Sequence, residues 1–196
     1  MTICIGDQEG AKKYIIPREF ACYFSPVLKA AFNSNFIEGQ TQNYRFTDTN
    51  EKAGCLLIQW LLTQKVGIYL PDDKGENLLL CQLYVLADHL LIPKLKNEVL
   101  ALVDSIHNLT NLTPTYCIEY VWKNTMAGSG LRRLFLTYCA LRLRPTYMAE
   151  YLGQFPKEML VEFAVFVAEN FVKLDRGRKH GNKHWSLKDY QEPEEE

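Results

Sequence analysis

The segment Cys55–Leu62 (CLLIQWLL) constrains the fold most, because it is apolar on nearly every side of a helix. We therefore expect a helix over this segment to be central to a core. A chain of 196 residues is long enough to build such a core without disulfides or a structural metal. With 47% hydrophobic and 23% charged residues, the composition is that of an ordinary folded domain.

Short β-rich pieces and helical periodicities alternate through the first half of the chain. Strands are predicted at residues 2–5, 12–16, 43–47 and 66–70. Pro17 opens a helical stretch in which Ser25 is the expected N-cap of a second helix that begins at Pro26. Further helices, the first of them capped by Asp48 or Thr49, are predicted to end near residues 65, 89 and 105. This order predicts an α+β fold in which a small β-sheet is covered by a helical cluster.

The second half of the chain is predicted to be all-helical. Helices are expected over residues 115–125, 131–141, 146–151 and 156–174, separated by glycine and proline breakers. The last of them carries an apolar stripe that we expect to be buried, formed by Leu160, Phe163, Ala164, Val167 and Phe171. The predicted organisation is a first domain over 1–105, a helical extension over 106–175 packed on it, and a disordered charged tail over 176–196.

The charge and cysteine patterns restrict the setting in which the chain works. Lys plus Arg number 22 and Asp plus Glu 23, so the molecule as a whole has no field that attracts nucleic acid or an anionic membrane. No secretory signal and no membrane-spanning segment is expected. Six widely spaced cysteines without a paired motif predict reduced thiols and a cytoplasmic or nuclear location.

Catalytic and metal-binding patterns are missing from the sequence, so we expect neither an enzyme nor a cofactor or metal. His89 beside Asp88 is interpreted as a hydrogen-bonded pair at a helix end rather than a catalytic dyad. His180 and His184 stand four residues apart but without cysteine or acidic partners, which disfavours a metal site. The basic stretch 176–188 could contact phosphates, although the acidic terminus offsets its charge.

Three motifs follow one another along the chain: Lys13–Phe32 (KYIIPREFACYFSPVLKAAF), Phe36–Glu38 (FIE) and Leu83–Leu95 (LYVLADHLLIPKL). Together and in this order they resemble the BTB/POZ family in its fungal form. The similarity covers residues 2–103, and the segment 112–172 looks like the helical extension that often follows such a domain. The resemblance implies a protein-interaction module, either a substrate adaptor for a cullin-type ubiquitin ligase or a homo-oligomerisation unit. The alternative hypothesis is a nuclear regulator that uses the basic stretch 176–188 for nucleic acid, a partner that we do not favour.

The resemblance also implies a contact site for the partner. Phe36, Ile37 and Glu38 match an apolar-x-Glu triplet that looks like a cullin-contact motif in the family. A competing interpretation is that Phe36 folds back onto Phe32 and leaves Glu38 solvated. Dimers of the family exchange strands with the help of a helix upstream of the first strand, whereas this sequence starts at that strand. We therefore expect a monomer or a weak homodimer.

Overall fold

The computed structural model describes residues 1–6, 10–67, 75–180 and 186–194. The chain divides into two compact units, Met1–Val99 with Pro193–Glu196, and Leu100–Glu192. The boundary between the units falls inside one helix, α6 (Pro93–Thr110), rather than at the predicted position 105. No helix among these described residues is long and apolar enough to cross a membrane.

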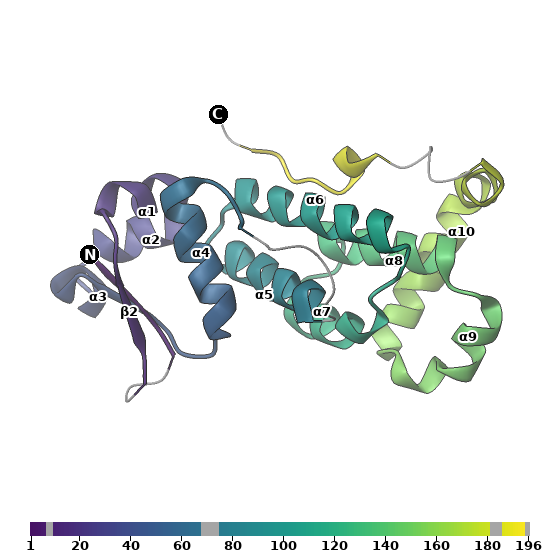
Figure 1. Cartoon of the computed structure of the whole chain (residues 1–196), viewed down its shortest axis with the longest axis horizontal. Helices are drawn as coiled ribbons and strands as arrows, with labels where there is room; N and C mark the ends of the chain where they lie inside the picture. Colours follow the sequence, from purple (N-terminus) through teal and green to yellow (C-terminus); the bar gives the residue numbers. More distant parts are fainter. Residues whose placement is uncertain (7–9, 68–74, 181–185, 195–196) are drawn as a thin grey trace. The chain divides into compact units, whose positions relative to one another are not determined.

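A three-stranded sheet organises the first unit (Figure 1). Its central strand β1 (Thr2–Ile5) pairs antiparallel with β2 (Lys12–Ile15) and parallel with β3 (Asn43–Phe46). Ile3 and Ile5 of β1 are fully buried, because the central strand is paired on both edges and covered by helices. The predicted hairpin and third strand are therefore present, with the sheet order β2-β1-β3.

The helices of the first unit surround the segment that opened the sequence analysis. Helix α4 (Glu51–Thr63) is central to the core of this unit, since it buries Leu57, Trp60 and Leu61 completely, although Leu62 near its end is 45% exposed. It packs mainly on α5 (Gly75–His89), which lies beside it in Figure 1. The remaining helices of the unit are α1 (Arg18–Phe24), α2 (Pro26–Phe32) and α3 (Ile37–Thr41), together with the start of α6.

The second unit is helical throughout its described residues. Helix α8 (Gly130–Arg142) is its central element, and ten of its thirteen residues are buried. The other helices are α7 (Ile118–Asn124), α9 (Pro145–Glu150) and α10 (Lys157–His180), with short 3-10 turns η1 (Thr115–Cys117), η2 (Leu152–Gln154) and η3 (Leu187–Asp189). The predicted fold class is confirmed: the chain is α+β, with a small sheet, a helical cluster and a helical extension.

Local chemistry explains most of the element ends. Ser25 caps α2 as predicted, since its hydroxyl accepts a hydrogen bond of 3.1 Å from the backbone N–H of Leu28. The cap of α4 is Asn50, whose side chain accepts from two backbone N–H groups, and not Asp48 or Thr49. Of the predicted strand 66–70, residues 66–67 are not in a strand and the rest lies outside the described residues.

Two predictions about the C-terminal part need correction. Residues 176–196 are not disordered over their described portion, because α10 continues to His180 and because Tyr190, which follows a capped turn, is only 5% exposed. The stripe on α10 is not buried as a whole either. Phe171 is 69% exposed, whereas Met159 and Leu174 are buried, so the helix turns a different set of residues inward.

Candidate functional site

The three residues of the predicted contact motif lie at the start of the short helix α3. Phe36 occupies the N-cap position and is 76% exposed, and Ile37 begins the helix and is 64% exposed. Glu38 stands in the first turn and is half-buried. The structure therefore places two large apolar side chains next to each other in solvent, with a carboxylate beside them.

The backbone that carries this motif is fixed by side-chain hydrogen bonds. The hydroxyl of Ser34 donates to the carbonyl of Ala31 (2.7 Å) and accepts from the backbone N–H of Phe36 (3.2 Å). At the other end, the amide of Gln42 donates to the carbonyls of Phe32 (3.2 Å) and Gly39 (2.7 Å). The segment after α2 is thus a turn followed by a short helix, both fixed by hydrogen bonds, whereas the sequence indicated only a polar stretch that ends α2.

A close backbone approach adds to this constraint. A Cβ atom built on Gly39 would lie 1.9 Å from the carbonyl oxygen of Ser34, a distance that no side chain tolerates. Glycine at position 39 is therefore what allows α3 to fold against the turn that precedes it. With its backbone held at both ends, Phe36 points into solvent without first having to be ordered.

Contrary to the competing interpretation of the motif, Phe36 does not fold back onto Phe32. Phe32 is 2% exposed, and its ring packs against Tyr44 of β3 at a centroid distance of 6.1 Å. Phe36 does not close over it, since three quarters of its side chain remain in solvent. Burial raises the pKa of Tyr44, and the negative charge of Glu38 raises it further.

The structure also shows where several other residues named in the sequence analysis lie. The carboxylate of Asp88 pairs with Lys96 of α6 at 2.5 Å, so it joins two helices of the first unit. His180 is described only by its backbone, and His184 lies outside the described residues, as does much of the basic stretch 176–188. Within the part of the chain that the structure describes, no three His, Cys, Asp or Glu side chains gather to hold a metal ion. All six cysteines are free thiols.

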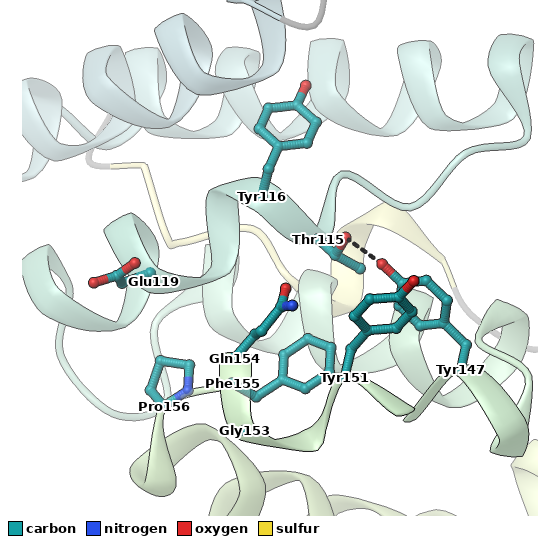
Figure 2. A pocket seen from close by; sticks show the side chains of 9 residues that line it. All are labelled: Thr115, Tyr116, Glu119, Tyr147, Tyr151, Gly153, Gln154, Phe155 and Pro156. Atoms are coloured by element: carbon teal, nitrogen blue, oxygen red, sulfur yellow. Dashed lines mark hydrogen bonds between the residues drawn. The ribbon is translucent and has the colours of Figure 1, made fainter. Parts of the chain in front are cut away.

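A hollow in the second unit was not predicted from the sequence (Figure 2). It has a volume of about 790 Å³ and is lined by Thr115, Tyr116, Glu119, Tyr147, Tyr151, Gly153, Gln154, Phe155 and Pro156. The rings of Tyr147 and Tyr151 lie 4.5 Å apart between centroids, and the hydroxyls of Tyr147 and Thr115 are 3.4 Å apart. The spacing of the two tyrosines by four residues was the available signal, because it puts them on one face of α9 and its end.

Both places present groups that can contact a ligand. The α3 surface offers apolar area and one carboxylate, and the hollow offers aromatic faces, hydroxyls, an amide and the carboxylate of Glu119. No model of a known protein family matches the chain, and a search of curated proteins finds no match. The assignment of a function therefore rests on the three sequence motifs and on the geometry of these surfaces.

Proposed function

We propose that the chain is a protein-interaction module of the BTB/POZ type and serves as an adaptor for a cullin-type ubiquitin ligase in the cytoplasm or nucleus. One observation carries the proposal: Phe36 and Ile37 are exposed at 76% and 64% on a segment whose backbone is held in place. The three ordered sequence motifs support the family, and the small sheet with its helical cluster is the architecture that the family requires.

The physical argument concerns what the two apolar side chains gain from a partner. Burying a Phe or Ile side chain in a groove contributes about 1.5–3 kcal/mol. Because the turn is already fixed by Ser34, Gln42 and Gly39, little of that gain is lost to ordering the loop. Glu38 beside the apolar pair can accept a charge-assisted hydrogen bond, which fixes the orientation of the partner.

The test is a binding measurement with a purified cullin N-terminal fragment, by calorimetry or interferometry on the full chain. Phe36→Ala and Glu38→Lys should each weaken binding by about tenfold or more, while the melting temperature stays within a few degrees. Matched controls are Tyr23→Ala, an aromatic that is 82% exposed on α1, and Glu19→Lys, an acidic residue in the first turn of α1. Both controls should bind like the wild type.

Two results would contradict this proposal in different ways. Equal losses in the α1 controls and in the α3 variants would show that the effect of substitution is not specific to the motif. A wild-type chain without measurable affinity at tens of micromolar would remove the adaptor role. A module for self-association or for another protein partner would then remain, and the same α3 variants would test that partner.

A further inference from the structure

A short segment near the C-terminus is seated on helix α8 of the second unit. Its 3-10 turn, η3, is closed by a capping box in which the hydroxyl of Ser186 and the carboxylate of Asp189 each accept a backbone N–H. Tyr190 follows the turn and is 5% exposed, although Lys188 and Asp189 on the same segment are exposed. A single turn has no core of its own, so contacts with the rest of the unit must hold it.

The polar contacts of this segment are those of a bound peptide. The hydroxyl of Tyr190 donates to the hydroxyl of Thr137 (3.0 Å), which in turn donates to the carbonyl of Arg133 (3.0 Å). The guanidinium of Arg133 donates to the carbonyls of Asp189 (2.8 Å) and Tyr190 (3.4 Å). Helix α8 thus recognises one phenol and two main-chain carbonyls, groups that any peptide with a correctly placed tyrosine can offer.

Gly130, the first residue of α8, allows the backbone of the C-terminal segment to come close to the helix. A Cβ atom built on Gly130 would lie 2.1 Å from the carbonyl oxygen of Tyr190. Glycine disfavours a helix by up to about 1 kcal/mol relative to alanine, so its presence at the start of α8 is explained by the close approach of the segment. Beside the segment a cavity of about 150 Å³ remains, lined among others by Asp104, Leu187 and Tyr190.

We propose that Gly130, Arg133 and Thr137 form a peptide-recognition groove, which the segment Ser186–Tyr190 occupies in cis and from which a partner protein's segment of the same chemistry displaces it. That chemistry is a serine-capped turn closed by an acidic residue and followed by tyrosine. The groove is separate from the α3 surface, shares no residue with it, and does not depend on the proposed cullin contact.

The partner is a different protein rather than a second copy of the chain. Each copy already has its own segment in its own groove, so an exchange between copies would form no new contact and would still lose association entropy. A tethered segment acts at an effective concentration on the order of millimolar. A competing segment must therefore bind more tightly than the resident one, or be held nearby at a high local concentration. The resident segment thus sets the minimum affinity that a partner needs in order to bind.

The experiment uses full-length chains and a fluorescein-labelled peptide of residues 186–192 (SLKDYQE), followed by anisotropy. Tyr190→Ala removes the resident anchor, so this chain should bind the peptide about tenfold or more tightly than the wild type does. Lys188→Ala, an exposed position on the same segment, should behave as the wild type. Adding Gly130→Ala to Tyr190→Ala should abolish binding, and a peptide with Phe for Tyr should bind about fivefold more weakly.

A second measurement covers the case in which Tyr190→Ala loses helical circular dichroism. Trypsin cleavage after Lys188 of the wild-type chain is followed with and without an excess of the peptide carrying Gln in place of lysine. Displacement in trans should speed that cleavage severalfold. The proposal is overturned if the peptide leaves the cleavage rate unchanged, if it binds the wild type and a folded Tyr190→Ala chain equally, or if it binds neither.

Discussion

Arg132 is the most consequential buried charge in the second unit, and its replacement by methionine is the sharpest test of how that unit is held together. Its side chain is 3% exposed, and its guanidinium connects α8 to the C-terminal end of α7 and to α10. It donates to the carbonyls of Trp122 (2.7 Å) and Thr125 (2.5 Å), to the hydroxyl of Thr125 (3.1 Å), and to the carboxylates of Glu158 (2.8 Å) and Glu162 (2.5 Å).

The expected magnitude follows from which of these partners are buried. Glu158 is 58% exposed, so water replaces its contact at little cost. Glu162 is 21% exposed, and the two carbonyls at the end of α7 belong to buried residues, so these groups would be left without their donor. Removing one partner from such a buried cluster costs about 3–5 kcal/mol. Arginine and methionine have similar helix propensities, so α8 itself contributes little to the difference.

The assay is urea denaturation followed by circular dichroism, with hydrogen exchange to locate the loss. Arg132→Met should lower the free energy of unfolding by about 3–5 kcal/mol and reduce protection in α7, α8 and α10. The control is Lys123→Met, which removes an exposed positive charge from α7 and should change stability by less than about 0.5 kcal/mol. A loss under about 1 kcal/mol in Arg132→Met would refute the view that this cluster holds the three helices.

Two further predictions concern pH and packing. Burial lowers the pKa of His107, and the charge of Arg142 lowers it further, while the hydrogen bond to Leu112 and the charge of Asp104 act in the opposite direction. As the pH falls, His107 therefore becomes protonated in the unfolded chain before it does in the folded one. The folded state with neutral His107 keeps its full stability above about pH 6.5 and loses part of it as the pH falls below that value. The urea midpoint should therefore drop more between about pH 7.5 and 5.5 in the wild type than in His107→Gln. Equal drops in the two chains would contradict this prediction. A Cβ on Gly54 would lie 2.5 Å from the buried Ile5 side chain, so Gly54→Ala should cost about 1–3 kcal/mol. Ile5→Val should recover part of that loss in a double-mutant cycle, and strict additivity would show that the two side chains do not meet.

The fold was largely predictable because the chain marks its elements with strong local signals. The alternation of β-rich pieces, Pro26 at the start of α2, and the all-apolar run in α4 each predicted an element that is present. Helix α6 runs on to Thr110 beyond its predicted end, because His107 is buried there: its ring stacks on Tyr138 at 3.7 Å and hydrogen-bonds the carbonyl of Leu112. That contact joins residues far apart in the sequence, and no local pattern announces it.

Helix α3 is another element that local sequence patterns could not predict. Its sequence, IEGQT, has no apolar periodicity, and a five-residue helix has almost no intrinsic stability. It exists because Gly39 lets the backbone approach Ser34 and because Gln42, with a positive φ of 53°, ends it and bonds two carbonyls. Sequence similarity could mark Phe36, Ile37 and Glu38 as a contact motif, but only the structure describes how firmly they are held.

Tyr190 was missed for a related reason. The composition around it is charged and rich in glycine and glutamate, which is typical of disorder. A single buried tyrosine, held by Thr137 and Arg133, is enough to order the short turn before it, and composition averages over such a residue. The partners of an anchor of this kind lie more than fifty residues away in sequence, so only a three-dimensional arrangement can reveal it.

The adaptor role that we propose requires the chain to hold two proteins at once, on two surfaces that can be occupied independently. The α3 motif belongs to the first compact unit and the Gly130–Thr137 groove to the second, and the two share no residue. A ligand influences another site only through a difference in its affinity for the states of the protein. Because the two surfaces have no common groups, we expect a coupling factor near one between them. The affinity of the Tyr190→Ala chain for the cullin fragment should therefore equal that of the wild type. A change of about tenfold or more would mean that release of the C-terminal segment alters the first unit, and the two sites would have to be treated as one regulated system.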